Sequence, residues 1–582
     1  MAVLGVDVGG TFTDAVLLAD GELRTAKVWT TSRQEESVVA AAAAVGAGEV
    51  ERFAHGTTAA TNALLERKGA RTAFVATSGF EHLLHLRRQD RAHLYRLCEA
   101  HPEPLVPLER CYGVRERMGP KGVLAPLELD SLPHLGDDIE AVAVCTLFSF
   151  RDPSNEQAVA AELRRRLPRA RVVASHEISP ELREYERAST AAVDAYLGPR
   201  VSGYLEALRD ACDAAGLPEP LVMRSSGGVA TLAEAAAHPA VALVSGPAAG
   251  VVGAARIARH AGVENAISLD MGGTSTDVSL ITRGEAGRTA ERVVAGLPVR
   301  LPTVDLQTVG AGGGSIVWRD SGGALRVGPE SAGAEPGPAC YARGGLRPTV
   351  TDANLLLGRL PSRLAGEIEP NRAAAERAFA GIDPAEAVEV VNAEMLRALR
   401  VVSVERGHDP RDFALVAFGG AGPLHGCALA EELGIRTVLV PAAAGVLSAL
   451  GLMASDERRD HVESYVCPLE EAVEVPAAGE ADLRYQGQSF ELTVPLQAEL
   501  ATAFHRAHEA RYGYAEPERR IELVAVRTAE VRPGPQFELP PAEPLEATGP
   551  AVLELDGATC WLPPGWVGVR DGTSSTIRLT RL

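Results

Sequence analysis

Two copies of one eight-residue pattern contain residues whose types and spacing suit the binding of a phosphate group. Both copies read Asp-x-Gly-Gly-Thr-x-Thr-Asp; they cover residues 7–14 and 270–277, so equivalent positions are 263 residues apart. Paired glycines permit a tight turn and bring backbone N–H groups close to an anion. Threonine hydroxyls add donors, and an aspartate at the end of a strand can hold Mg²⁺ directly or through water.

The two copies predict a cleft in which two hairpins face one another and bind the phosphates of a nucleotide from opposite sides. Apolar, β-prone residues flank each copy, which predicts a hairpin. A pair of ordinary glycine-rich hairpins is the alternative, and the repetition disfavours it. We expect Asp7 and Asp270 to be the magnesium and phosphate-site carboxylates, while Asp14 and Asp277 brace the hairpins. The other expected catalytic and phosphate-binding residues are Thr11, Thr274, Gly9, Gly10, Thr13, Gly272, Gly273 and Thr276.

A third glycine-rich turn, FGGAGPLHG at 418–426, follows a buried strand pattern and precedes a helical pattern. By itself this motif favours a close strand–helix packing turn. After two phosphate hairpins it favours an ATP site, because small residues let the backbone approach adenosine. We therefore expect Gly419, Gly420 and Gly422 to lie against adenosine, and His425 to have a packing or capping role.

Strand patterns alternate with helical patterns over most of the chain, which predicts an α/β fold. The stretch 98–137 is rich in proline, glycine and charge and is typical of an insertion without a strong core pattern. Helical patterns at 181–196 and 200–215 predict two separate helices. From about residue 460 short strands alternate with turns, which predicts a small β-rich domain at the C-terminal end.

The composition argues against several classes of protein. A formal charge of −20 argues against a nucleic-acid partner. The chain has no unbroken apolar run long enough for a membrane span, and its N-terminal residues lack the basic region of a secretory signal. Scattered cysteines fit a reduced, cytoplasmic protein. None of the three lysines, Lys27, Lys68 and Lys121, belongs to a P-loop, so an ATP site must be of another kind.

The hairpins and FGGAGPLH resemble the phosphate and adenosine motifs of the actin-like ATPase and sugar-kinase superfamily. More specifically, the chain resembles hydantoinase A, the ATP-binding half of 5-oxoprolinase and the β subunit of acetone carboxylase. Further matching segments include HGTTAATNALLERKGARTAFVATSGF (55–80), EYERASTAAVDAYLGP (184–199), SGPAAGVVGAA (245–255), VDLQTVGAGGGSIVW (304–318) and TVTDANLLLGRL (349–360). Asp194 and Ser226 depart from residues that are common in these proteins, which leaves the substrate open.

The resemblance implies an architecture of two actin-like (ribonuclease H-like) domains around a nucleotide cleft. The expected domains are residues 1–198, with an insertion near 80–137, residues 199–460, and a small β-rich domain over residues 461–582. It also implies a function: ATP-dependent opening of a cyclic amide of the hydantoin or 5-oxoproline type, with Mg²⁺ as the metal. Phosphorylation of the carbonyl oxygen would create a good leaving group before water attacks. A hydantoinase B-like partner subunit is implied, and homodimerisation is left open.

For the residues that would contact the substrate, the sequence leaves a structural role and a binding role open. His55, Thr57 and Thr58 precede a predicted helix, where either threonine could be the N-cap, or the group could contact the substrate. Arg88, with Arg87 and Arg91, belongs either to a solvated basic face or to a site for a substrate anion. Asp305 and the glycine-rich loop 310–315 are expected where a substrate or partner approaches.

Three other functions remain open from the sequence. A ketone carboxylase would use the same ATP residues, so this chain cannot distinguish it from an amide hydrolase. A nucleotide-gated assembly module without catalysis is disfavoured by the family-specific segments at 304–341. A simple sugar kinase ranks lowest.

Overall fold

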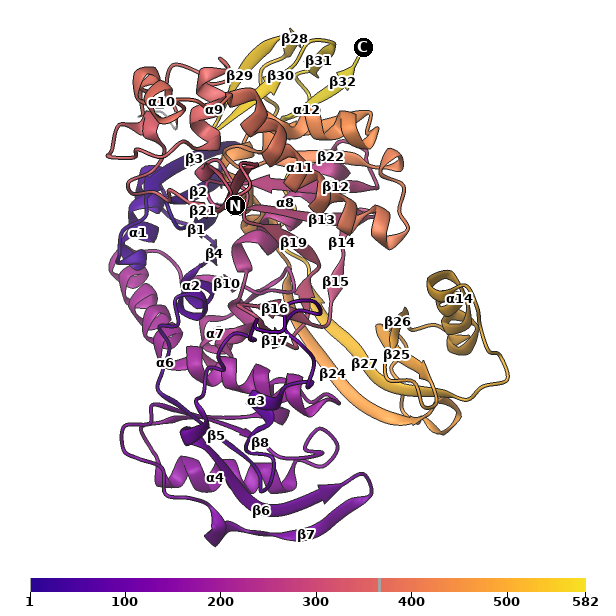
Figure 1. The fold of residues 1–582 in the computed structure, drawn as a ribbon. Coiled ribbons are helices and arrows are strands. Elements are labelled where there is room, and N and C mark those ends of the chain that lie inside the picture. Colours follow the sequence, from indigo (N-terminus) through magenta and orange to yellow (C-terminus); the bar gives the residue numbers. More distant parts are fainter. Residues whose placement is uncertain (1, 365–367) are drawn as a thin grey trace.

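The computed structural model describes residues 2–364 and 368–582, and its centre is formed by two sheets that repeat one pattern (Figure 1). In the first sheet, β1 pairs antiparallel with β2, β2 pairs antiparallel with β3, and β1, β4 and β10 run parallel. The bounds are β1 Val3–Val8, β2 Phe12–Ala19, β3 Glu22–Trp29, β4 Arg52–Gly56 and β10 Leu221–Met223.

The second sheet has the same arrangement around the second copy of the motif. Strand β12 pairs antiparallel with β13, β13 pairs antiparallel with β19, and β12, β22 and β23 run parallel. The bounds are β12 Ala266–Met271, β13 Thr276–Thr282, β19 Leu306–Val309, β22 Ala414–Phe418 and β23 Thr437–Pro441. Because parallel neighbours need helical crossovers, α11 (Pro384–Val402) precedes β22 and α12 (Gly422–Leu433) connects β22 to β23. Helix α8 (Ser245–His260) precedes β12 and leads from the first sheet into the second. The mixed α/β prediction and both predicted hairpins are confirmed.

A third, five-stranded sheet is inserted between β4 and β10. Its strands are β5 Thr72–Thr77, β6 Cys111–Gly119, β7 Gly122–Glu128, β8 Ala141–Cys145 and β9 Arg171–Ala174. The prediction that 98–137 lacks a core pattern is wrong for β6, because Val114 and Met118 are buried. The insertion is also larger than 80–137, because β5, β8 and β9 belong to the same sheet.

The two helices predicted at 181–196 and 200–215 are one helix, α6, from Glu184 to Ala214, with Pro199 inside it. Proline removes a backbone donor and normally ends or kinks a helix. Here Leu197, Val201 and Leu205 are buried on both sides of the proline, so tertiary packing holds the helix together through this position.

The C-terminal residues are rich in strands, as predicted, but most of these strands extend the two central sheets; β29 (Ala551–Leu555) and β30 (Ala558–Leu562) alone pair as a separate two-stranded sheet among the described residues after 460. β24 (Glu457–Pro468), β25 (Glu480–Tyr485), β26 (Leu492–Pro495) and β27 (Ile521–Arg532) extend the first sheet. β28 (Leu545–Thr548), β31 (Trp566–Arg570) and β32 (Thr576–Arg581) extend the second. In Figure 1 the long β24–β27 ribbon projects from the body and has β25, β26 and α14 (Leu500–Tyr512) at its outer end.

The largest apolar core lies around α8 and α13 (Leu447–Ala454), between the two sheets. These helices touch through glycines: a Cβ at Gly253 would lie 2.8 Å from the Leu447 carbonyl oxygen, and one at Gly451 would collide with Ala249. The close approach therefore requires both glycines. Within the described residues, no helix is long and apolar enough to cross a lipid bilayer.

Candidate active site

The first hairpin presents a row of charged side chains on one face of its sheet. Asp7 pairs with Asp14 across β1 and β2, and Asp14 pairs with Lys27 across β2 and β3. Directly opposite residues in antiparallel strands lie on the same face. Lys27 Nζ donates to Asp14 Oδ1 at 2.5 Å and to the Gly445 carbonyl oxygen at 3.2 Å. Lys27 therefore braces Asp14 and joins the first sheet to the loop after β23.

The second hairpin repeats this row with different bracing groups. Asp270 pairs with Asp277, and Asp277 pairs with Thr308 on β19. The Thr308 hydroxyl donates to Asp277 Oδ1 at 2.5 Å and accepts a hydrogen bond from Arg292 Nη2 at 3.0 Å. In both hairpins the second aspartate of the motif is thus held by a neighbouring strand.

Helix α8 brings the first aspartates of the two motifs together. A Cβ at Gly246 would lie 3.5 Å from both carboxylate oxygens of Asp7, and a Cβ at Gly250 would lie 3.2 Å from Asp270 Oδ2. Gly246 and Gly250 are one helical turn apart, which is about 6 Å along the axis. Asp7 and Asp270 therefore approach the same stripe of α8 from the two repeated hairpins.

The carboxylates of the first row contribute to the pKa of Asp270, so the two rows lie within electrostatic range. The pKa of Asp7 is raised to about 7, mainly by burial and also by repulsion from Asp14, against the attraction of Lys27. The pKa of Asp270 is raised to about 8, mainly by burial and also by repulsion from Asp277, Asp7 and Asp14. Asp7 Oδ1 is buried without a hydrogen-bond partner among the described residues. This surplus of buried negative charge fits a divalent cation, so Asp7 and Asp270 fit the magnesium that the sequence predicts.

The hydroxyls of the motif threonines fall into two groups. Thr13 and Thr276 are fully buried, and their hydroxyls contact the Thr30 hydroxyl at 3.0 Å and the Ala311 carbonyl oxygen at 2.5 Å. Thr274 is exposed and Thr11 is half-buried, each beside the glycines of its turn. The geometry therefore suits Thr11 and Thr274 for contact with a phosphate better than Thr13 and Thr276.

The glycine-rich loop 310–315 packs on the second hairpin. Backbone N–H groups of Gly313 and Gly314 donate to the carbonyl oxygens of Gly272 and Gly273 at 2.9 and 2.6 Å. A Cβ at Gly312 would lie 2.7 Å from the Gly273 backbone, so only glycine fits there. The loop thus shapes the predicted phosphate turn.

The third turn, FGGAG, lies against the end of β12. Gly419 has φ +79°, and a Cβ there would collide with the Asp270 carboxylate. A Cβ at Gly422 would lie 3.1 Å from the Leu269 carbonyl oxygen. Gly420 is more open, its nearest neighbour being the Gly557 carbonyl oxygen at 3.8 Å from a Cβ. The predicted adenosine turn and the second phosphate hairpin therefore form one continuous wall.

His55 and its neighbours join β4 to α8. His55 is fully buried, and its ring nitrogens contact the Val6 carbonyl oxygen at 3.1 Å and the Tyr204 hydroxyl at 2.8 Å. The Ser245 hydroxyl donates to the Thr57 carbonyl oxygen at 2.8 Å. Thr58 is the N-cap of α2 (Ala59–Leu65), although Thr57 Oγ1, and not Thr58, accepts from the Ala59 N–H. These contacts favour the packing and capping alternative for this segment.

The other predicted substrate residues form ion pairs within the chain. Arg88 Nε donates to Glu186 Oε1 at 2.7 Å, and Asp305 pairs with Arg406. His425 is buried and its Nδ1 contacts Asn392 Oδ1 at 2.7 Å, in agreement with a packing role.

Sequence reasoning missed several residues that shape the site. They are Lys27, Gly56, Gly246, Gly250 and Asp556. Lys27 could have been found, because a hairpin register places it beside Asp14. Asp556 could not, because its turn returns from the C-terminal strands to contact Thr25.

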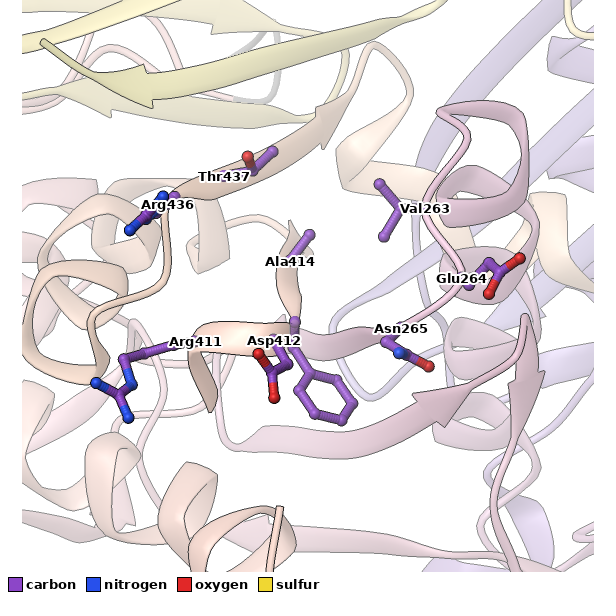
Figure 2. A pocket seen from close by; sticks show the side chains of 9 residues that line it. Val263, Glu264, Asn265, Arg411, Asp412, Ala414, Arg436 and Thr437 are labelled. Carbon is purple, nitrogen blue, oxygen red and sulfur yellow. The ribbon is translucent and has the colours of Figure 1, made fainter. Parts of the chain in front are cut away.

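A cavity of about 270 Å³ lies at the amino-terminal ends of strands β12, β22 and β23 in the second sheet (Figure 2). Asp270 lies at the other end of β12. The lining residues of the cavity immediately precede β12, β22 and β23; among them are Asn265, Arg411 and Arg436. Asp270 and Gly419 instead lie at the carboxyl ends of β12 and β22, where ligands of α/β sheets bind. This cavity is therefore distinct from the candidate active site.

Two family models together match most of the chain. The model described as "Hydantoinase/oxoprolinase" matches residues 187–461, and the one described as "Hydantoinase/oxoprolinase N-terminal region" matches residues 3–167. The resemblance stated from the sequence is therefore confirmed, as is the expectation of an enzyme of this kind at the level of the family.

Individual relatives span more than one named activity. The caprolactamase subunit alpha of Pseudomonas jessenii is 35% identical, and the match covers 99% of each chain. The acetophenone carboxylase gamma subunit of Aromatoleum aromaticum is 34% identical over 78% of this chain and 68% of its own. 5-Oxoprolinase 1 of Arabidopsis thaliana is 36% identical over 70% of this chain but only 36% of its own. The crystal structure of the ATP-dependent caprolactamase from P. jessenii matches the whole fold with a TM-score of 0.85 at 31% identity.

Proposed function

Because the chain belongs to the hydantoinase/oxoprolinase family, we propose that it is the ATP-binding subunit of an ATP-dependent cyclic amide hydrolase. The observation that supports this best is the convergence of Asp7 and Asp270, from two repeated hairpins, on one stripe of α8. The proposal includes the actin-like arrangement of domains 1–198 and 199–460 around a nucleotide cleft. It also includes a cytoplasmic location.

The proposed reaction transfers the γ-phosphoryl group of ATP to the carbonyl oxygen of the ring amide. Amide resonance makes this carbonyl a poor electrophile. Phosphorylation turns the oxygen into part of a leaving group, so that water can then open the ring. Such a transfer needs alignment and neutralisation of charge more than a covalent nucleophile from the protein.

Each group of residues has one task in this proposal. Asp7 and Asp270 would hold Mg²⁺, which supplies positive charge to the phosphate oxygens when bound. The backbone N–H groups of Gly9, Gly10, Gly272 and Gly273, with the hydroxyls of Thr11 and Thr274, would hold the phosphates. Gly419, Gly420 and Gly422 would lie against adenosine. Asp14 and Asp277 would keep the two hairpins in position. His55, Arg88 and Asp305 are left as structural residues.

A second polypeptide of the hydantoinase B type is part of the proposal. Two relatives that match along most of the chain are named as subunits, alpha in one case and gamma in the other. We expect little or no complete turnover without that partner.

A ketone carboxylase subunit is the second candidate, and the acetophenone carboxylase relative supports it. Both functions need the same ATP residues, so the acceptor of the phosphoryl group distinguishes them. The test is ADP release by the chain with its candidate partner, supplied with caprolactam, 5-oxoproline, hydantoin or a ketone, each with and without bicarbonate.

Release that depends on an amide but not on bicarbonate supports the hydrolase. Release that requires both a ketone and bicarbonate would replace it with the carboxylase. If no small molecule stimulates ADP release, both proposals fail.

A further inference from the structure

A second cavity, of about 390 Å³, lies where the C-terminal strands extend the second sheet. It is separate from the cavity of Figure 2, which lies around the amino-terminal ends of β12, β22 and β23. The volume is within the range of about 300–1,000 Å³ that is usual for small-molecule sites. The lining side chains come from the end of α8, from β23, from the segment before β28, and from β31, β32 and the turn between them.

One face of the second sheet contributes a row of three side chains to this cavity. Leu439 of β23 pairs with Arg578 of β32, and Arg578 pairs with Val569 of β31. Directly opposite residues in antiparallel strands have their side chains on the same face. Leu539, which precedes β28, also lines the cavity. A single guanidinium group therefore lies between apolar side chains.

Arg578 supplies a positive charge that is not neutralised within the chain. Its Nη2 donates to the carbonyl oxygen of Ala261, the C-cap residue of α8, at 2.8 Å. Over residues 2–364 and 368–582 the guanidinium group forms no ion pair with a carboxylate. Because a guanidinium group has five N–H donors, those that remain can bind a carboxylate of a ligand.

Asp571 supplies a negative charge from the turn between β31 and β32. Its Oδ1 accepts hydrogen bonds from the N–H group of Thr573 at 2.9 Å and from the Thr573 hydroxyl at 2.8 Å. These bonds lower the pKa of Asp571, so the carboxylate is ionised at neutral pH. In the described part of the chain it likewise forms no ion pair. The carboxylate can therefore also bind an ammonium group.

The two charges line the same cavity without neutralising each other. Asp571 follows Val569 by two residues, and Val569 is directly opposite Arg578. Such diagonal positions on antiparallel strands are about 7–8 Å apart. A ligand with a carboxylate at one end, an ammonium group at the other and a short apolar chain between them would complement both charges and the apolar side chains beside them.

Other charged groups near the cavity act on His260, which lies at the end of α8. Burial lowers the pKa of His260, as do Arg256 and Arg259, whereas Glu538 raises it. His260 is therefore uncharged at neutral pH. Among the described residues, Arg256, Arg259 and Glu538 do not line the cavity. Arg578 and Asp571 are thus the charges that a ligand would contact.

Helix α8 connects this cavity with the candidate active site. Its C-terminal end, at His260 and Ala261, lines the cavity. Nearer its N-terminal end, the same helix packs against the carboxylates of Asp7 and Asp270. A ligand in the cavity would therefore contact the helix on which both carboxylates converge.

The loop after β23 is a second connection. The Ala442 N–H donates to the Ser575 carbonyl oxygen of the cavity at 2.7 Å. Three residues further on, the Gly445 carbonyl oxygen accepts a hydrogen bond from Lys27, which braces Asp14. This loop therefore has the cavity on one side and the bracing groups of the first hairpin on the other.

We propose that this cavity is an effector site for an amino acid whose amino and carboxylate groups are at opposite ends of the molecule. Hydrolysis of a lactam releases such a compound, because the ring nitrogen becomes an amine and the carbonyl group becomes a carboxylate. The site would bind the ring-opened product, and this binding would be coupled to nucleotide binding through α8 and the loop after β23. The identity of the ligand rests on the proposed function, because that function makes the amino acid a product.

The test measures the binding of 6-aminohexanoate to the full chain by calorimetry. Hexanoate and hexylamine have the same number of carbon atoms but only one charged group each. We expect 6-aminohexanoate to bind at least about tenfold more tightly than either, because hydrogen bonds between charged groups are strong. Arg578→Gln and Asp571→Asn should each remove most of this preference. Arg581→Gln is the control, because this exposed residue lies on the same strand and on the opposite face.

The coupling is measured by repeating the titration with Mg²⁺ and a non-hydrolysable ATP analogue. The affinity for 6-aminohexanoate should change by about fivefold or more, and the affinity for the nucleotide should change by the same factor, because coupling between two sites is reciprocal. Arg578→Gln should bind the nucleotide as the unaltered chain does, and this affinity should no longer respond to 6-aminohexanoate.

Equal affinities for the three compounds, a preference that survives in both cavity variants, or an equal loss in the Arg581 control would overturn the inference. An affinity that the nucleotide does not alter would overturn the coupling. If lactams stimulate ATP hydrolysis but 6-aminohexanoate does not bind, the hydrolase proposal stands and the effector site does not. If 6-aminohexanoate binds through Arg578 and Asp571 but no cyclic amide stimulates hydrolysis, the cavity remains an amino-acid site and the proposed function fails.

Discussion

At the scale of single residues, the buried carboxylates of Asp7 and Asp270 determine which kind of ligand the site favours. Each is removed from water at the end of a strand, and neither has a cation as a direct partner among the ion pairs described above. An uncompensated buried charge costs free energy, which appears here as pKa values of about 7 and 8. Ligand binding can repay this cost if the ligand supplies positive charge, as a magnesium–nucleotide complex does.

Asp270→Asn should therefore separate stability from activity. The amide keeps the shape of the side chain and removes the repulsion from Asp277 and Asp7, so the unfolding temperature should stay equal or rise. ATP hydrolysis should fall by a factor on the order of 100 or more, because a direct charge on the metal–phosphate site is lost. Asp210→Asn, in an exposed residue of α6, is the control. Normal hydrolysis by the Asp270 variant would show that this carboxylate is misassigned.

Within residues 2–364 and 368–582, Lys27 is the one cation that forms an ion pair with Asp14. The pair is half-buried, with side-chain exposures of 17% and 19%, so its removal leaves a carboxylate with little water. Lys27→Met should lower the free energy of unfolding by about 1–3 kcal/mol, and adding Asp14→Asn should recover part of the loss. Urea denaturation of the two single variants and the double variant measures the coupling. Simple additivity would mean that the pair contributes nothing.

At the scale of elements, the positions of the carboxylates depend on glycines in neighbouring strands and helices. Gly56 is the register partner of Asp7 on β4, and Gly419, the residue after the register partner of Asp270 on β22, lies beside the Asp270 carboxylate. Gly246 and Gly250 have no side chain on the surface of α8 that faces the carboxylates of Asp7 and Asp270, so both carboxylates can approach the helix closely. In an isolated hairpin the two carboxylates could adopt other rotamers. Because these positions are glycines, the neighbouring strands and α8 can pack directly against the carboxylates and fix their orientation.

Gly56→Ala tests this packing without changing any polar group. A methyl group there would collide with the Asp7 carboxylate and lie 3.3 Å from Leu452 Cδ1. ATP hydrolysis should fall at least about tenfold, because small displacements of aligned groups are costly. Gly203→Ala in α6 faces open space and should leave hydrolysis unchanged. Equal activity of the two variants would show that Asp7 tolerates displacement.

At the scale of the whole molecule, the C-terminal strands extend both of the repeated sheets. β24 and β27 continue the first sheet, and β31 and β32 continue the second. The turn between β29 (Ala551–Leu555) and β30 (Ala558–Leu562) brings Asp556 to Thr25. A Cβ at Gly557, in the same turn, would lie 3.1 Å from Lys27 Cε. Residues near the end of the chain thus contribute to a site whose first residue is Asp7.

Two histidines that are buried in neutral form should each lower the free energy of unfolding as the pH falls below neutral. Burial lowers the pKa of His55 to about 4 and that of His425 to about 3, from 6.5 when unfolded. Below pH 6.5 the unfolded chain binds protons that the folded chain does not, so each histidine costs about 1.4 kcal/mol between pH 7.5 and 5.5.

The measurement is the free energy of unfolding at pH 7.5 and 5.5 for His425→Gln and for His461→Gln, an exposed control. The His425 variant should lose less stability on acidification than the control by about 1.4 kcal/mol. Asp7 and Asp270, whose raised pKa values act in the opposite direction, are common to both variants and cancel. Equal losses would mean that His425 is protonated in the folded state.

The sequence by itself determined the two hairpins, their repetition and the turn at Gly419, because glycine pairs, strand propensity and motif spacing act over a few residues. It also determined the α/β class, and through the resemblance it identified the family. The tertiary structure decided the rest. Lys27 lies beside Asp14 because of the register of β2 and β3, Gly246 and Gly250 contact the aspartates through helix packing, and Asp556 reaches Thr25 from the C-terminal strands. Such contacts depend on how distant elements pack, and no local spacing of residue types encodes them.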